Sequence, residues 1–252
     1  MNLLNHGAPP RVLSICAILF LSPTLHAEER CSVELKLLLL PKDTRSVIAA
    51  LNLNKEQSGR VYFFDTPTLD LLSQGVILRL RRGAANDLTV KLRPREGKRF
   101  SDPSEGREDF KCEVDQNATE INTSYSIGSQ YSAASLPETG KDTVSLLSVG
   151  QKKLLEEAQV SIEWQRVKRI ADIQTTDWQT DARPQFKKLT MELWPSSACS
   201  ILELSTKVEA HAGPSAYAEL KRLVNAKGFP LNTSQQPKTT MILEAVTHTT
   251  AH

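Results

Sequence analysis

Two segments that follow each other closely in the sequence alternate basic with apolar residues. The segments cover residues 76–82 and 88–93, and each carries basic residues two positions apart: Arg79, Arg81, Lys91, Arg93. This spacing predicts two strands that each have one basic face and one apolar face. One such strand alone is typical of a sheet with a solvent-exposed side. Two neighbouring strands of the same charge repel each other, so the pair favours a sheet face that binds an anion.

The overall charge favours an internal anion site over a nucleic-acid surface. The chain has 252 residues, with 31 Lys and Arg against 29 Asp and Glu. A near-neutral total with concentrated basic faces is not typical of a nucleic-acid-binding protein. Aromatic residues make up only 6% of the chain, and no nucleic-acid-binding motif is present. We therefore expect a small anionic ligand and no nucleic acid.

The first 27 residues have the pattern of a secretory signal peptide. Arg11 precedes an apolar run at residues 12–21, and Ala27 precedes a charged segment. The run is too short to span a bilayer as a helix, and a small residue at its end is typical of a cleavage site. We expect export to the periplasm or secretion, with no stable membrane anchor.

Hydrophobic periodicity predicts a single domain at residues 28–246 and a frayed tail at residues 247–252. Helices are expected at residues 44–53, 146–159 and 215–226. Further strands are expected at residues 111–114, 161–173, 187–194 and 201–209. Loops are expected at residues 95–109 and 116–142.

Five segments match the pattern of a known family in its own order. Residues 31–40 read Cys-Ser-Val-Glu-Leu-Lys followed by four leucines. They resemble the opening strand of the CYTH superfamily, the triphosphate tunnel metalloenzymes, whose signature is Glu-x-Glu-x-Lys. Residues 62–81 and 89–93 resemble its Tyr-Phe-Asp-Thr-Pro…Gly-x-x-Leu-Arg-x-Arg and Thr-x-Lys-x-Arg segments. Residues 201–208 and 237–243 resemble its returning acidic strand and its terminal lysine segment.

The resemblance implies a fold and a set of site residues. The fold is α+β, a closed antiparallel eight-stranded β-barrel that forms a triphosphate tunnel, with flanking helices. The implied phosphate-binding residues are Lys36, Arg79, Arg81, Lys91, Arg93, Arg166, Lys168 and Lys238. The implied metal ligands are Glu34, Glu203 and Glu113, and Glu34 and Lys36 carry the implied catalytic role. Two alternatives stay open: Arg169 competes for the inward position if the strand register slips, and Glu113 and Asp115 can be solvated strand charges.

The sequence departs from the family pattern at two metal-ligand positions. Ser32 replaces the first glutamate of the signature, and Ser205 replaces the second carboxylate of the returning strand. Two functions therefore remain. The first is hydrolysis of a triphosphate or inorganic polyphosphate with Mg²⁺ or Mn²⁺, which can bind with one or two carboxylates. The second is binding of a polyanion or organic phosphate without turnover. Export argues against a nucleotide cyclase, because nucleoside triphosphates are scarce outside the cytosol.

Cysteine and histidine residues limit the remaining chemistry. After residue 27 the cysteines are Cys31, Cys112 and Cys199, of which one pair can form a disulfide in an oxidising compartment. We expect Cys31 to pair with Cys199, because each shortly precedes an acidic residue of a tunnel strand. The few histidines argue against a histidine-ligated metal centre or a Ser-His-Asp hydrolase, and no phosphate-binding glycine loop is present.

Overall fold

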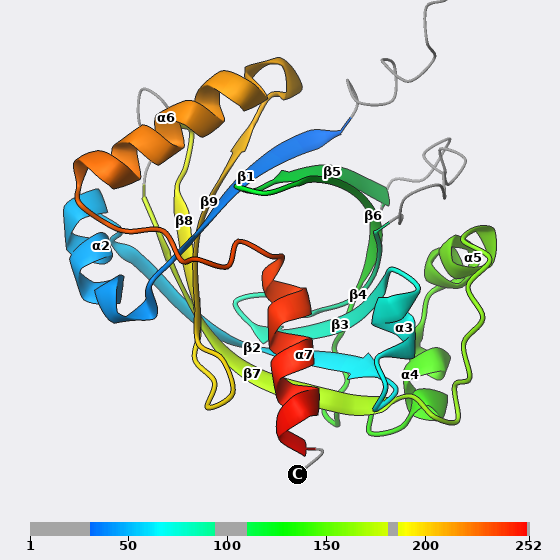
Figure 1. Cartoon of the computed structure of the whole chain (residues 1–252). Coiled ribbons are helices and arrows are strands. Elements are labelled where there is room, and N and C mark those ends of the chain that lie inside the picture. The colour runs from blue at the N-terminus through cyan, green and yellow to red at the C-terminus, as the bar shows by residue number, and fades with distance from the viewer. Residues whose placement is uncertain (1–30, 94–109, 181–185, 251–252) are drawn as a thin grey trace, which may run out of the picture.

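A closed β-barrel forms the body of the protein (Figure 1). The computed structural model describes residues 31–93, 110–180 and 186–250. The predicted signal peptide and the predicted loop 95–109 lie outside these ranges. The strands are β1 Ser32–Leu39, β2 Lys55–Asp65, β3 Val76–Gly83, β4 Asp87–Leu92, β5 Phe110–Gln116, β6 Ile121–Gln130, β7 Lys168–Gln179, β8 Thr190–Trp194 and β9 Ile201–Val208. Their order around the barrel is β1-β5-β6-β4-β3-β2-β7-β8-β9.

The barrel differs from the expected one in strand number and direction. The described residues form nine strands where eight were expected. The pairing of β1 with β5 is parallel, whereas the other neighbouring pairs of the described barrel are antiparallel. The architecture is therefore a mixed closed barrel with flanking helices, and the α+β class is confirmed.

Strand β6 lies inside the segment 116–142, which was wrongly predicted to be a loop. Its Ser, Thr and Asn residues have the composition of a loop, but Ser124 and Ser126 are buried and lie opposite Glu113 and Lys91. Ile127, on the other face, packs in an apolar cluster. A strand that lines a polar interior needs no apolar inner face, so its alternation is weak in the sequence.

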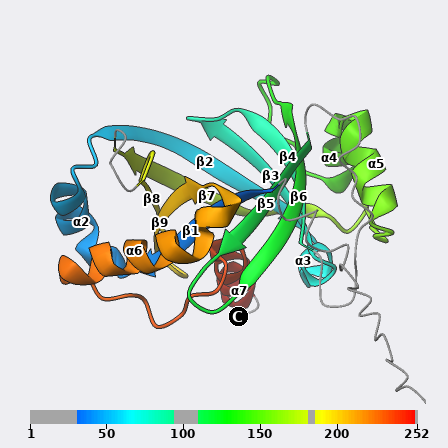
Figure 2. The same cartoon turned by 90° about the horizontal axis from the view of Figure 1, so that it is seen from above.

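Helices cover two opposite sides of the barrel (Figures 1 and 2). Their bounds are α2 Thr44–Leu51, α3 Asp70–Ser73, α4 Gly140–Leu146, α5 Val149–Glu157, α6 Gly213–Ala226 and α7 Lys238–Thr250, with short 3₁₀ helices η1 Pro41–Asp43 and η2 Ala210–Ala212. Helices α2 and α6 pack on the outer face of β1 and β9, and α5 packs on β4 and β6. Each fully buried leucine in these layers stabilises the fold by about 1.5–3 kcal/mol.

The predicted helices 44–53 and 215–226 are present as α2 and α6. The predicted helix 146–159 is shorter, because α4 ends at Leu146 and a new helix begins after Ser148. The Ser148 side chain accepts a hydrogen bond from the Gln151 backbone N–H, and the Gln151 side chain accepts one from the Ser148 backbone N–H. This reciprocal pair is the capping box of α5.

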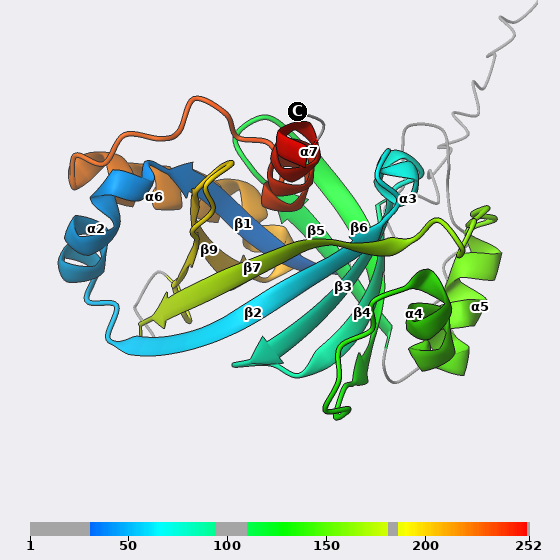
Figure 3. The ribbon, with the colours of Figure 1, turned by 90° about the horizontal axis from the view of Figure 1, so that it is seen from below.

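Helix α7 lies at one end of the barrel, between the side covered by α2 and α6 and the side covered by α4 and α5 (Figure 3). Its Ile242 and Leu243 pack with Leu38, Phe63 and other apolar side chains that fill this part of the interior. The helix continues through Thr250, within the segment expected to be a tail. None of the helices in the described ranges has the length and apolar character needed to cross a membrane.

Strand β7 begins later than predicted. Residues 161–167 were expected to extend it, but the strand starts at Lys168. Val160, Ile162 and Trp164 alternate with polar residues in the sequence. They pack against the apolar cluster that also contains side chains of α4 and α5, without forming a strand. Alternation over such a short stretch does not distinguish a strand from an extended loop on an apolar surface.

The predicted disulfide is wrong: Cys31 is bonded to Cys112, and Cys199 is free and partly buried. The reason is strand direction. Strand β9 runs antiparallel to β1, so the residue pair Leu39 and Leu202 places the start of β9 beside the end of β1. Cys31 and Cys199 therefore lie at opposite ends of the barrel. Strand β5 runs parallel to β1, which places Cys112 beside Cys31.

Candidate functional site

Five of the predicted phosphate-binding residues line one internal cavity. The cavity has a volume of about 60 Å³, and its basic residues are Lys36, Arg79, Lys91, Arg93 and Lys238. They come from β1, β3, the end of β4 and the start of α7, because the alternation of each strand turns its basic side chains inward. Asp115 and Glu203 also line the cavity. Residues far apart in the sequence thus meet at one place.

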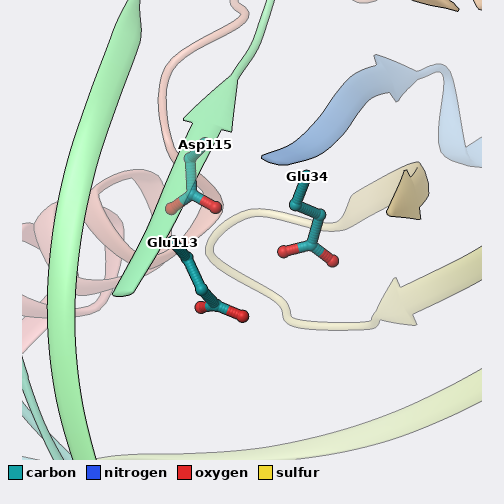
Figure 4. Close-up of side chains that lie close together, drawn as sticks. All are labelled: Glu34, Glu113 and Asp115. Atoms are coloured by element: carbon teal, nitrogen blue, oxygen red, sulfur yellow. The ribbon is translucent and has the colours of Figure 1, made fainter. Parts of the chain in front are cut away.

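Three carboxylates meet beside this cavity (Figure 4). One oxygen each from Glu34, Glu113 and Asp115 lies within 4.8 Å of the others. The parallel pairing of β1 with β5 causes this, because it places Ser32 opposite Glu113 and Glu34 opposite Asp115. Strand β5 therefore brings two carboxylates next to the position where Ser32 lacks one. Oxygen ligands of this kind suit Mg²⁺ or Mn²⁺.

Asp115 is the centre of the ion pairs in the cavity. It accepts a hydrogen bond from Lys36 Nζ at 2.7 Å, from Lys91 Nζ at 3.3 Å and from Arg93 Nη2 at 3.4 Å. Burial opposes its ionisation, but these three cations outweigh burial and hold its pKa well below the usual range. Asp115 is therefore ionised at neutral pH. The sequence left open whether it is a solvated charge, and in the structure it is buried.

Glu34 and Glu113 are paired with neighbouring lysines. Lys36 Nζ lies 3.0 Å from Glu34, and Lys91 and Lys207 lie 3.3 and 2.6 Å from Glu113. Burial raises the pKa of Glu113, but Lys91 and Lys207 outweigh it and lower the pKa to about 2. This carboxylate stabilises the fold above its unfolded pKa of about 4.3, and the contribution is lost as the pH falls towards 2.

Glu203 does not belong to the group of three carboxylates. It is buried and accepts a hydrogen bond from Lys238 Nζ at 2.7 Å, and the same ammonium group is bonded to Glu192. Burial lowers the pKa of Lys238, but the two carboxylates outweigh burial and raise it. The ammonium also lies 4.9 Å from the centre of the Trp194 ring. Glu203 therefore holds a protein cation in this structure.

Two arginines of the cavity carry buried N–H groups without a hydrogen-bond partner among the described residues. These groups are Nε of Arg79 and both Nε and Nη1 of Arg93. Burial is the main cause that lowers the pKa of Arg79, and the neighbouring Arg81 adds to it. A buried donor without an acceptor costs about 1–3 kcal/mol. An anion in the cavity would remove this cost.

Arg81 is paired with an acidic residue and does not take part in the cavity. Arg81 Nε donates to both carboxylate oxygens of Asp87 at 3.1 Å, and Arg81 does not line the cavity. Ser32 is exposed at the start of β1, whereas Ser205 is buried opposite Lys36. Arg81 is therefore neutralised within the barrel wall.

Arg166 and Lys168 do not line the cavity. Arg166 sits in the turn before β7, where it pairs with Asp70 at 3.0 Å on the surface. Lys168 is exposed at the first position of β7. Arg169, the alternative considered, pairs with Glu138 and lies over the Tyr62 ring on the outer side of the barrel. The late start of β7 explains these positions.

Asp177 is a tunnel residue that sequence reasoning missed. It lies on β7 directly opposite Glu192 on β8, and its Oδ1 is buried without a partner among the described residues. Burial is the main cause that raises its pKa to about 6, and Glu192 adds to the rise, while Lys238, Arg81 and Lys188 oppose it. A polar residue alternating on a strand gives no signal that two acids will face each other.

We expect Asp177→Asn to stabilise the protein at neutral pH. Because the pKa of Asp177 is higher in the folded protein than in the unfolded chain, ionisation of this group destabilises the fold. The cost is absent below about pH 4 and develops as the pH rises through about 6. The gain in the free energy of unfolding at pH 7.5 should be about 1–2 kcal/mol, discounted for partial exposure, and should vanish near pH 4. Urea denaturation at both pH values measures it. Asp172→Asn, on the exposed face of β7, is the control. An equal gain at both pH values would contradict the explanation.

Comparisons with known proteins support the fold. No protein-family model matches the sequence, and no curated protein matches it. A candidate adenylyl cyclase from Hippeastrum, described as having a dominant triphosphatase activity, is similar in structure with a TM-score of 0.59 and 15% identity, over 84% of this chain and 94% of that one. A candidate adenylate cyclase from Bacillus halodurans gives a TM-score of 0.57 and 13% identity, over 84% and 96%. These two proteins are therefore similar to this chain in their overall fold.

Proposed function

We propose that this protein binds a triphosphate-containing anion inside the barrel and hydrolyses it with the help of Mg²⁺ or Mn²⁺. The observation that carries the proposal is the convergence of Arg79 and Arg93 on a cavity that three lysines also line. Both arginines carry buried N–H groups that no group in the described part of the chain accepts. Phosphate oxygens are suitable acceptors for such groups, and charge-assisted hydrogen bonds are the strongest of their class. The triphosphatase activity described for the Hippeastrum protein is consistent with this proposal.

The carboxylates of Glu34, Glu113 and Asp115 fit a divalent metal ion. They offer carboxylate oxygens at one place, and the low pKa of Glu113 keeps that group ionised across the physiological range. When bound, the ion would polarise a phosphoryl oxygen and lower the pKa of a bound water. Glu203 is not proposed as a ligand, because it lies outside this group of three carboxylates.

The chain's own residues would orient the anion and compensate its charge. Lys36 and Lys91 each contact the carboxylates and also line the cavity, so they can bridge a phosphate and the acidic group. Leu38 and Ile77 form an apolar part of the wall and limit the access of water. Shelter from water strengthens each ionic hydrogen bond to the ligand.

A second candidate function is binding of a polyanion or organic phosphate without turnover. Two features favour it. Ser32 and Ser205 stand at positions where the resemblance implies carboxylates. The three remaining carboxylates are also bonded to lysines, so a metal ion has to compete with protein cations. Both functions use the same cavity.

Export is also part of the proposal. Residues 1–27 have the pattern of a signal peptide, and disulfides such as Cys31–Cys112 persist in oxidising compartments. We therefore propose a periplasmic or secreted protein. Fractionation of cells that express the full chain, with an antibody against residues after 28, tests this location. A full-length cytosolic product would contradict it.

Phosphate release from tripolyphosphate separates the two functions. The purified protein is assayed with Mg²⁺, with Mn²⁺ and with EDTA, and binding is measured in parallel by calorimetric titration. Release that requires a metal supports the enzyme. Binding without release under all three conditions supports the binding function. No binding would contradict both.

Replacing Arg79 or Arg93 by alanine should weaken tripolyphosphate binding by about 1.5–3 kcal/mol each, which is roughly 10- to 150-fold in Kd. The free protein should lose little stability, because three of the buried nitrogens removed, Nε of Arg79 and Nε and Nη1 of Arg93, have no partner among the described residues. Calorimetric titration and a melting curve measure both effects. Arg222→Ala, at an exposed site on α6, is the matched control. Unchanged affinity in both cavity variants would mean that these arginines do not contact the anion.

A further inference from the structure

Among the described residues, four cations pair with the three carboxylates of Glu34, Glu113 and Asp115. The cations lie 2.6–3.4 Å from the carboxylate oxygens and are Lys36, Lys91, Arg93 and Lys207. The group therefore combines three negative charges with four positive ones before any ligand binds. A divalent ion that binds here has to displace at least one of these cations, because like charges repel strongly at such short distances.

Lys207 differs from the other three cations in what it can contact after it leaves a carboxylate. Lys36, Lys91 and Arg93 also line the internal cavity, so a phosphate can accept their hydrogen bonds. Lys207 does not line this cavity. Its side chain is 58% exposed, whereas the side chains of the other three are 13–19% exposed. Water is therefore the alternative partner of Lys207, and an exposed ion pair of this kind is weak.

The strand register explains how Lys207 reaches the acidic group. Lys207 on β9 lies opposite Glu34 on β1, and Glu113 on β5 lies opposite Ser32 on β1. The Lys207 ammonium nevertheless lies 2.6 Å from Glu113, so its side chain crosses β1 beside Ser32. A serine leaves more room for this crossing than the glutamate of the family pattern would. The ion pair thus joins two strands that are not neighbours.

We infer that Lys207 is a competitor for the metal that is built into the chain. It holds Glu113 in the free protein, and a divalent ion that binds to the three carboxylates displaces it into solvent. Lys207 thereby determines the metal concentration at which the site fills, and it does not hold the phosphates. This inference rests on the proposed function, because it concerns the metal ion of the same site.

Titration of the free protein with Mn²⁺, followed by electron paramagnetic resonance, tests the inference without turnover. Lys207→Met keeps the length of the side chain and removes its charge, so it should tighten Mn²⁺ binding by at least about 10-fold. Lys207→Arg keeps the charge and should bind Mn²⁺ no more tightly than the native protein. Lys187→Met is the matched control, because Lys187 is an exposed lysine that pairs with Glu209 instead. Tripolyphosphate affinity in EDTA should be nearly the same in all of these proteins.

The displacement can also be followed in the native protein, which avoids any effect of a substitution on folding. Lysines are acetylated with an N-hydroxysuccinimide ester, and the rate at each lysine is read by mass spectrometry. Saturating Mg²⁺ should raise the rate at Lys207 several-fold, because the amine released from Glu113 faces water. The rate at Lys187 should not change.

The outcomes separate this inference from the proposed function. Equal Mn²⁺ affinity in a folded Lys207→Met variant and the native protein would overturn the inference and leave the proposed function intact. An unchanged acetylation rate at Lys207 under saturating Mg²⁺ would do the same. Weaker tripolyphosphate binding in Lys207→Met would show that Lys207 holds the anion and would also overturn it. Failure of the native protein and of every variant to bind Mn²⁺ would overturn the metal role in the proposed function itself.

Discussion

Replacing Cys31 and Cys112 together by serine is expected to lower the free energy of unfolding by about 2–5 kcal/mol. The disulfide joins residues 81 positions apart, so its loss releases a long loop in the unfolded chain. It also lies at the end of the β1–β5 pairing, whose register covers four residue pairs. That pairing is parallel, which is slightly less stable than an antiparallel one, and it places the like charges of Glu34 and Asp115 opposite each other.

The same double variant should also lower the affinity of Glu34, Glu113 and Asp115 for a divalent metal ion, because β1 and β5 hold these three carboxylates together. Urea denaturation measures the loss of stability, and titration with Mn²⁺ measures the effect on the site. Cys199→Ser is the control. Cys199 is not in the disulfide, so this substitution should lower the free energy of unfolding much less. Addition of a thiol reductant to the native protein should reproduce the double variant. A double variant as stable as the native protein would mean that the β1–β5 contacts alone close the barrel.

Side-chain alternation predicted which faces of the strands are basic, but not which strands are neighbours. The inward side of β3 and β4 could be read from the sequence because their outward residues, such as Leu78 and Val90, are uniformly apolar. The parallel pairing of β1 with β5 could not, because the two strands are separated by three others in the sequence. Both the correct disulfide and the carboxylate group depend on that pairing.

The site was predicted best where a basic residue lies on a strongly alternating strand. Arg79, Lys91 and Arg93 lie on or directly after such strands and line the cavity. Arg166 and Lys168 do not line the cavity, because the alternation before β7 belongs to a segment that packs against the same apolar cluster as α4 and α5. Electrostatic pairing was also not predictable, since it depends on contacts between strands that are distant in the sequence.

The structure places a carboxylate of another strand beside Ser32, where the family pattern has a glutamate. In the sequence, Ser32 marks a missing ligand on β1. In the barrel, Ser32 lies directly opposite Glu113, so a carboxylate of the neighbouring strand stands beside the position. Ser205 instead lies directly opposite Lys36 on β1 and Thr190 on β8, neither of which is an acid. The acidic centre of the site is therefore on the β1–β5 side of the barrel.

Glu34→Gln should reduce metal-dependent phosphate release by at least about 100-fold, if the protein is the proposed enzyme. Loss of residues that only orient metal ligands costs about 10- to 100-fold, so loss of a ligand should cost at least as much. Tripolyphosphate affinity in EDTA should change by no more than a few-fold, because Lys36 keeps its hydrogen bond to Asp115 and the arginines of the cavity are untouched. Glutamine has nearly the same size as glutamate, so the packing of β1 should not change.

Two measurements distinguish this metal role from a purely structural one. Titration with Mn²⁺ should show weaker metal binding in Glu34→Gln than in the native protein, and the melting temperature without metal should be nearly equal for both. Glu156→Gln, at an exposed position on α5, is the matched control and should keep full activity. Unchanged phosphate release in Glu34→Gln would exclude Glu34 as a ligand. A native protein that binds tripolyphosphate and releases no phosphate with either metal would instead establish the binding function, since the basic cavity would then act without the carboxylate group.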